Sequence, residues 1–198
     1  MSKRLFDLIA SLVALIVLAP LLFGIAAAIK LDSRGTVFFR QERVGLHGRV
    51  FRIHKFRTMV ADAEHAGLQL TPRDDPRITR VGAFLRRHKL DELAQLIDVV
   101  RGDMSIVGPR PEVPRYVALY PTEVRRVVLS VRPGITDVAS VAYRDEGAQL
   151  ASGTDPEQLY VNVILPQKLN LCVEYVRNRS LAGDLVIVMR TLAALLRA

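Results

Sequence analysis

Cysteine is nearly absent from this chain, and internal repeats and low-complexity tracts are missing as well. Cys172 is the single cysteine, so no disulfide can form within the chain. Its apolar neighbours, Leu171 and Val173, predict a buried thiol rather than a nucleophile. No internal repeat or low-complexity tract is visible. The 198 residues are therefore expected to form one ordinary core with one extra element.

Acidic residues are outnumbered, with 20 Asp and Glu against 28 Lys and Arg, which gives a formal net charge of +8 at pH 7. Such a surplus indicates an acidic partner, which could be nucleic acid, an anionic bilayer surface or phosphorylated small molecules. The basic residues do not alternate with aromatic ones, as they do in many surfaces that bind single-stranded nucleic acid. No nucleic-acid partner is therefore expected.

Strongly polar residues are nearly missing from residues 5–29, where Asp7 and Ser11 are the exceptions. The run lacks the polar face that an amphipathic helix of a soluble protein needs. Its Leu, Ile, Val and Phe residues favour insertion by on the order of 5 to 9 kcal/mol on the membrane-insertion scale. A small-x-small cleavage site with a polar mature start is also missing, which argues against a signal peptide. Residues 1–30 are predicted to be a membrane-inserted helix.

The flanks of this run leave its topology open. Lys3 and Arg4 precede it while Lys30 and Arg34 follow it, so the positive-inside rule gives no orientation. Pro20 removes a backbone donor, and a bend there could return the chain to the leaflet that it entered from. A kinked single span is the alternative, because about 25 residues at about 1.5 Å each are long enough to cross a core of about 30 Å.

The remaining residues predict an α+β domain, compact and rich in helices, with a short β-hairpin. The last predicted helix is apolar apart from two arginines, and either packs in the core or lies along a bilayer surface. The pattern predicts strands at 36–41 and 50–54 around a turn at 45–48, helices at 90–100, 156–163, 166–177 and 184–197, and loops at 102–114 and 132–134.

An acidic pair, Asp91 and Glu92, lies in the first turn of the helix predicted at 90–100. On its own such a pair simply complements the helix dipole. Successive helical residues point about 100° apart, so one carboxylate could attack while the other held a cation or a proton. Attack on phosphorus also needs positive charge to offset an anionic donor, and Arg86 lies just upstream.

Three further basic residues are candidate phosphate ligands. Lys55 and Arg57 share a face if their strand continues, and together they could receive a diphosphate. Arg110 lies between two prolines, whose restricted backbone could hold its guanidinium toward a phosphate. The alternatives are a solvated strand edge for the first two and simple loop rigidity for the third.

Five motifs follow one another in the chain, and the longest has ten residues. Together they resemble the bacterial sugar transferases, also called monotopic polyprenyl-phosphate phosphoglycosyltransferases, over nearly the whole chain. The motifs are Lys3–Asp7, Lys55–Met59, Leu90–Leu93, Gly102–Pro111 and Arg132–Thr136.

The resemblance implies an N-terminal re-entrant membrane helix broken at Pro20, and a catalytic domain at residues 31–198 on the cytosolic face of the bacterial inner membrane. It implies transfer of a sugar 1-phosphate from a UDP-sugar to undecaprenyl phosphate, with release of UMP. This would be a first membrane step in the synthesis of a surface glycoconjugate or exopolysaccharide.

The resemblance also implies roles for single residues. Asp91 resembles the nucleophile that forms a phosphosugar-enzyme intermediate, and Glu92 its metal-handling or proton-handling neighbour, so the pair is expected to hold Mg²⁺. Arg86 and Arg110 resemble phosphate ligands, as Lys55 and Arg132 do more weakly.

One departure from the family pattern leaves the sugar open, because Asp137 stands where glycine is common. Two other functions stay possible from the sequence. One is a membrane-tethered basic module that binds nucleic acid, and the other is a scaffold in which the acidic pair merely caps a helix. Release of UMP from a UDP-sugar separates the enzyme from both.

Overall fold

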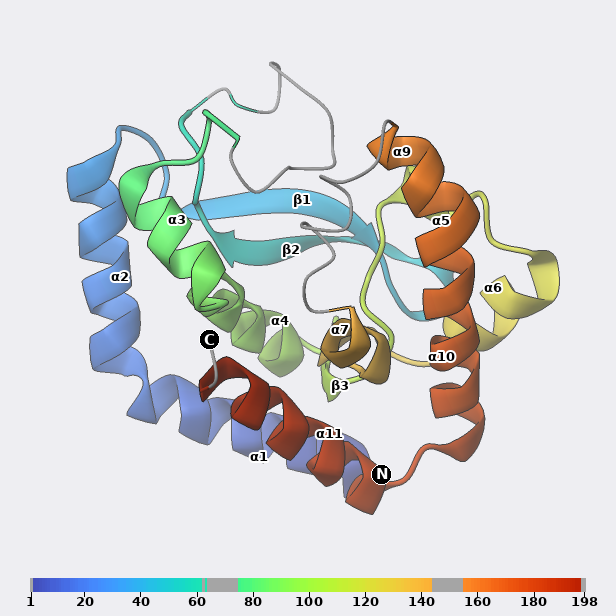
Figure 1. The fold of residues 1–198 in the computed structure, drawn as a ribbon. Coiled ribbons are helices and arrows are strands. Elements are labelled where there is room, and N and C mark those ends of the chain that lie inside the picture. Colours follow the sequence, from blue (N-terminus) through green and yellow to red (C-terminus); the bar gives the residue numbers. More distant parts are fainter. Residues whose placement is uncertain (1, 62, 64–74, 144–154, 197–198) are drawn as a thin grey trace.

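The computed structural model describes residues 2–61, 63, 75–143 and 155–196. Within these ranges, helices surround two sheets of two strands each (Figure 1). The predicted α+β class with its short hairpin is confirmed.

The first 32 residues form two helices that meet at an angle. α1 (Ser2–Val17) and α2 (Ala19–Asp32) are bent by 63° relative to each other. Pro20 lies in the first turn of α2, where its missing N–H and its ring oppose one straight helix, so the predicted break is confirmed. Among the described residues, no single helix has the length and apolar composition of a membrane span, whereas this bent pair meets both criteria jointly.

α1 has a polar side, and that side faces the rest of the protein. Asp7 and Ser11 are buried, and the Ser105 hydroxyl donates to the Asp7 carboxylate at 2.8 Å. The Lys3 ammonium donates to the buried carboxylate of Asp184 in the last helix. The prediction of a run without a polar face is therefore wrong for α1, because Lys3, Asp7 and Ser11 recur every four residues and so lie on one side of the helix. Lys3 and Asp7 find partners there, whereas the buried Ser11 hydroxyl has none among the described residues.

The other side of α1 is apolar and exposed. α2 is divided in the same way, since Ile25 and Ile29 pack against Phe56, while Phe23 and Leu31 are exposed. The bent pair therefore packs on the domain with one side only. The exposed apolar residues of α1 are Leu5, Ile9, Leu12, Val13, Ile16 and Val17.

Both strands of the predicted hairpin are present. β1 (Phe38–Val44) pairs antiparallel with β2 (Val50–Phe56), and the 3₁₀ turn η1 (Leu46–Gly48) joins them. β1 is shifted relative to the prediction, because it begins at Phe38 rather than Thr36 and continues through the charged Glu42 and Arg43 to Val44. β2 continues two residues further than predicted, to Phe56.

The helix predicted at 90–100 is divided into two helices. α3 (Arg80–Arg87) ends just before it, and Lys89 then takes a left-handed conformation with φ of 55°. η3 (Leu90–Gln95) is a 3₁₀ helix packed against β2, and α4 (Leu96–Arg101) follows. Tertiary packing thus overrides the α-helical period in the first turns, and the tighter winding separates successive side chains by about 120°.

The segments predicted as loops contain a second small sheet, so those predictions are wrong in part. β3 (Ser105–Val107) pairs in parallel with β4 (Gly134–Thr136). The two backbone segments come so close that a Cβ on Gly134 would lie 2.1 Å from the Gly108 nitrogen. Strands of three residues are too short to leave an alternating pattern.

The helices after β3 enclose the main core. Its buried members include Tyr116, Tyr160, Leu169 and Cys172, and burial raises the pKa of that thiol, as expected for a structural cysteine. The helices that follow β3 and β4 are α5 (Pro114–Val117), α6 (Thr122–Val128) and α7 (Val138–Ala142).

The two helices predicted at 156–163 and 166–177 are continuous. α9 (Pro156–Leu159), the π-helical turn η4 (Tyr160–Ile164) and α10 (Leu165–Asn178) run without a gap. The Leu165 N–H bonds to the Tyr160 carbonyl five residues back, and this wider turn precedes Pro166, which has no N–H to donate.

α11 (Leu181–Leu196) packs on the domain with one side, and whether its other side lies along a bilayer stays a prediction. Asp184 and Ile187 are buried against the domain, whereas Leu185, Val186 and Met189 are exposed. In Figure 1 this helix lies beside α1, where the contact between Lys3 and Asp184 joins the two.

Candidate active site

Four segments bring five charged side chains into electrostatic contact. They come from the end of β2, the last turn of α3, the 3₁₀ helix η3 and the loop after β3. When all are ionised, three cations face two carboxylates, and the nearby Lys89 adds a further positive charge that acts on both carboxylates, so the site suits an anionic ligand. The five residues are Lys55, Arg86, Asp91, Glu92 and Arg110.

Glu92 is held between two of these cations. The Lys55 ammonium donates to Glu92 Oε1 at 3.0 Å, and the Arg110 guanidinium donates to both carboxylate oxygens, with one bond of 2.9 Å. Burial alone would raise the pKa of Glu92, but the charges of Arg110 and Lys55 outweigh it and hold that pKa well below its usual range. Glu92 is thus a fixed anion.

Asp91 has the opposite environment. Its side chain is buried, and Oδ1 has no hydrogen-bond partner among the described residues. Burial raises the pKa of Asp91, although Lys55 and Arg86 oppose the shift. A buried carboxylate oxygen without a partner is unfavourable for folding, and it is available to a ligand.

Arg86 is held beside this pair by the packing of α3. Its Nε donates to the Thr58 hydroxyl at 3.0 Å. α3 comes so close to this strand exit that a Cβ on Gly82 would lie 2.0 Å from the Thr58 carbonyl oxygen. Only glycine permits this approach, which brings Arg86 near Asp91.

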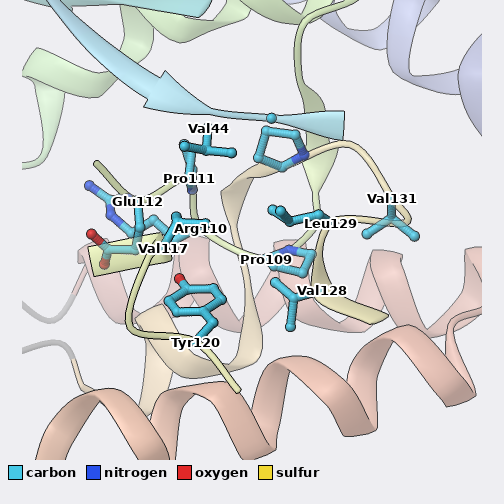
Figure 2. Close-up of a pocket in the computed structure, with 12 residues that line it drawn as sticks. Val44, Pro109, Arg110, Pro111, Glu112, Val117, Tyr120, Val128, Leu129 and Val131 are labelled. Atoms are coloured by element: carbon cyan, nitrogen blue, oxygen red, sulfur yellow. The ribbon is translucent and has the colours of Figure 1, made fainter. Parts of the chain in front are cut away.

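Arg110 is held by its loop. Val44 N–H donates to the Glu112 carbonyl at 2.9 Å, and Gly134 N–H donates to the Pro109 carbonyl at 3.0 Å. Figure 2 shows the residues that line the small cavity beside this loop, with the Tyr120 hydroxyl directed toward the loop. The cavity volume of about 10 Å³ leaves room for at most one water molecule, so the loop is firmly packed.

Arg57 and Arg132 make their contacts elsewhere. β2 ends at Phe56, and the Arg57 guanidinium donates to the carbonyls of Ser33 and Arg34, which ties the end of α2 to the sheet. Arg132 donates to the Gly102 carbonyl at 2.8 Å, at the end of α4 away from Asp91. The structure does not bring these two arginines to the acidic pair, and their phosphate-binding roles stay predictions.

Comparison with known families gives this arrangement its context. The family described as bacterial sugar transferase matches residues 1–198. The chain belongs to the bacterial sugar transferase family. The ordered motifs indicated the same family.

Named relatives cover almost all of this transferase. An undecaprenyl-phosphate glucose phosphotransferase of Komagataeibacter xylinus is 40% identical over 198 aligned positions, and the match covers 97% of this chain and 35% of the relative. A UDP-glucose:undecaprenyl-phosphate glucose-1-phosphate transferase of Caulobacter vibrioides is 38% identical, over 99% of this chain and 70% of the relative. A UDP-N-acetylgalactosamine-undecaprenyl-phosphate N-acetylgalactosaminephosphotransferase of Aeromonas hydrophila is 37% identical, over 98% of this chain and 43% of the relative. This chain thus spans from about a third to under three quarters of their length, and their names specify different sugars.

Two buried carboxylates behind the site of this transferase did not emerge from the sequence. Asp137 Oδ2 accepts the backbone N–H of Arg110 at 3.1 Å, and Asp98 Oδ2 accepts that of His54, the neighbour of Lys55, at 2.8 Å. Partners so distant in sequence leave no local signal. Asp137 also caps α7, and an aspartate before a short helical pattern is the one sign that could have found it.

The predicted magnesium site fits one of its two carboxylates. Among the residues that the structure describes, no three His, Cys, Asp or Glu side chains form a metal-binding group. Mg²⁺ commonly binds one or two carboxylates and keeps water and substrate phosphates as its other ligands. The unpartnered oxygen of Asp91 suits this role, whereas Glu92 must first give up Lys55 or Arg110.

Proposed function

We propose that this protein moves a sugar 1-phosphate from a UDP-sugar to undecaprenyl phosphate and releases UMP, with Asp91 holding the phosphosugar covalently in between. The observation that carries the proposal is the buried Asp91 carboxylate, with one oxygen unpartnered, beside Lys55 and Arg86. The names of the relatives support the two substrate classes.

The reaction divides into two displacements at one phosphorus atom. A carboxylate oxygen of Asp91 attacks the β-phosphorus of the donor, the bond from that phosphorus to the UMP oxygen breaks, and UMP leaves with the electron pair. A phosphate oxygen of the lipid then attacks the same phosphorus and breaks its bond to Asp91, which regenerates the carboxylate.

The neighbouring cations stabilise the charge that develops in both displacements. Arg86 and Lys55 flank Asp91, while Arg110 is oriented by its two bonds to Glu92. A Mg²⁺ ion held at Asp91 would supply Lewis-acid neutralisation of the donor diphosphate, and Glu92 would become a further ligand only after giving up Lys55 or Arg110. Glu92 remains ionised and keeps the cations in place.

The bent pair α1 and α2 is the proposed membrane element, re-entering the cytosolic leaflet of the inner membrane. Three observations support this placement: the 63° bend, the exposed apolar side of α1, and basic residues on both flanks. The active site then lies at the cytosolic face, where a water-soluble donor and a lipid acceptor can both reach it.

Incubating the enzyme with labelled UDP-sugar in the absence of lipid tests the covalent step. We expect about one UMP per active site and label on the protein at Asp91. A ternary mechanism would release UMP only after lipid is added, and that outcome would exclude the intermediate. A screen of UDP-sugars with a short polyprenyl phosphate then identifies the donor, and no release with any of them would favour the scaffold.

A further inference from the structure

A groove between α7, α10 and α11 has no part in the chemistry proposed above. Its volume of about 330 Å³ is within the range of small-ligand sites. Much of its lining is apolar, with Val138 from α7, Leu171 from α10, and Val186 and Ile187 from α11. An occupant with apolar carbon chains would therefore bury them against these residues.

The rim of the groove carries charge. Arg179 at the end of α10 and Arg190 on α11 both line it and are exposed. Neither guanidinium has an ion pair or hydrogen bond within the described part of the chain. Glu174 is the one acidic residue in the lining, so the rim has one net positive charge. An occupant with an anionic head group would match this balance.

The groove opens beside apolar surface. α11 exposes Leu185, Val186 and Met189 next to it, and α1, which lies alongside in Figure 1, exposes its own apolar side. The bond between Lys3 and Asp184 joins the two helices. A lipid could therefore leave a chain against the exposed apolar residues of α11 while its head group reached the arginines.

We propose that the groove binds an anionic glycerophospholipid of the surrounding bilayer, with the lipid phosphate between Arg179 and Arg190 and an acyl chain along the apolar floor. The proposal rests on the proposed function only in placing the protein at a membrane. Glu174 repels the same phosphate, so it weakens the binding without preventing it.

An introduced tryptophan can report on this site, because the chain has none of its own. Val186→Trp places the reporter in the groove, and Val13→Trp places one on the exposed side of α1. Both proteins are reconstituted in vesicles of equal parts phosphatidylglycerol and phosphatidylcholine, with bromine on the chains of one lipid or of the other. The two bilayers then have the same lipid composition and differ only in which lipid carries the bromine quencher.

We expect brominated phosphatidylglycerol to quench Val186→Trp more strongly than brominated phosphatidylcholine, with a local enrichment of roughly fivefold per arginine. Val13→Trp should be quenched about equally by both. Should Val186→Trp fail to fold, Met189→Trp at the edge of the groove serves instead. Equal quenching at the groove position would overturn the proposal, since it would show bulk bilayer and no head-group site.

Charge variants in the Val186→Trp background separate the head-group site from simple proximity. Arg179→Gln together with Arg190→Gln should abolish the preference, and Glu174→Gln should strengthen it. Arg126→Gln, on exposed α6, should leave it unchanged. A preference for phosphatidylglycerol that survives the loss of both arginines would reject the assignment. Displacement of phosphatidylglycerol by stoichiometric polyprenyl phosphate would also reject it, because the groove would then bind the lipid acceptor. The quenching requires no turnover, so it can succeed even where UMP release fails.

Discussion

The two adjacent carboxylates of the site have opposite electrostatic environments. Glu92 is paired with Lys55 and Arg110, whereas Asp91 is buried with an unpartnered oxygen. Neighbouring titratable groups whose pKa values are shifted in opposite directions are typical of active sites. The contrast supports the reactive role proposed for Asp91 and the organising role proposed for Glu92.

Replacing Asp91 with asparagine should therefore act in two directions. We expect activity to fall by roughly a thousandfold or more, because an amide is a poor nucleophile, with loss of the UMP burst and of the label. We expect the melting temperature at neutral pH to rise, because burial already favours the neutral form at this position. Thermal unfolding in detergent and rapid-quench UMP assays measure the two effects. Normal turnover by Asp91→Asn would return Asp91 to the role of a helix cap.

The pH dependence follows from the raised pKa of Asp91. Attack needs the carboxylate ionised, so activity should fall as pH drops through a folded-state pKa that lies above the ordinary 3.8. Between the ordinary pKa and the raised pKa, the folded state binds more protons than the unfolded state. The contribution of Asp91 to the free energy of unfolding therefore falls as pH rises through that window. The gain in melting temperature of Asp91→Asn should disappear below the window. An acidic limb of kcat/KM at or below the ordinary value would contradict the assignment.

At the scale of elements, the break between α1 and α2 decides the path of the N-terminal segment. Pro20→Leu restores a backbone donor and removes the ring, so we expect the two helices to straighten and the segment to become a span. Cysteines at residues 2 and 33, with Cys172→Ala, report the topology through labelling with impermeant reagents. Both should react only from the cytosolic side, and on opposite sides once Pro20→Leu is added. Opposite-side labelling with Pro20 in place would establish a single span.

At the scale of the whole molecule, α1 is part of the domain as well as its proposed anchor. The Arg4 guanidinium donates to the carbonyls of Val99 at 2.6 Å and Val100 at 3.2 Å, at the end of α4. Arg4→Gln should lower the free energy of unfolding by about 2 kcal/mol, because both bonds have a charged donor. Denaturation in detergent measures the loss. The control Arg126→Gln, whose side chain is 76% exposed, should change it by less than about 0.5 kcal/mol. Equal effects would show that α1 docks only loosely.

The charge balance of the assembled site leads to the last prediction. Even with Lys89 counted, the cations outnumber the two carboxylates by only two, and Lys55 and Arg110 are already bonded to Glu92, so a donor diphosphate still needs a bridging cation. Turnover should therefore stop in excess chelator and return when Mg²⁺ is added. Calcium, which prefers longer bonds and more ligands, should restore it poorly. Full activity in chelator would remove the metal from the proposal.

Much of this protein could be predicted from the sequence wherever local chemistry dominates. The hairpin follows from alternating residues around a glycine-flanked turn, the bend from Pro20, and the buried thiol from the apolar neighbours of Cys172. The family followed from five ordered motifs. Each of these depends on residues close together in the chain, where steric rules apply regardless of the remaining fold.

Tertiary structure alone decided the rest, because it depends on partners far apart in sequence. The 3₁₀ winding of η3 comes from packing on β2, the three-residue strands β3 and β4 exist only through each other, and the polar side of α1 became visible only with its partners Ser105 and Asp184. The difference between Asp91 and Glu92 has the same origin. Two neighbouring carboxylates are chemically alike in the sequence, and the distant Lys55 and Arg110 make Glu92 a fixed anion and leave Asp91 with an unpartnered oxygen.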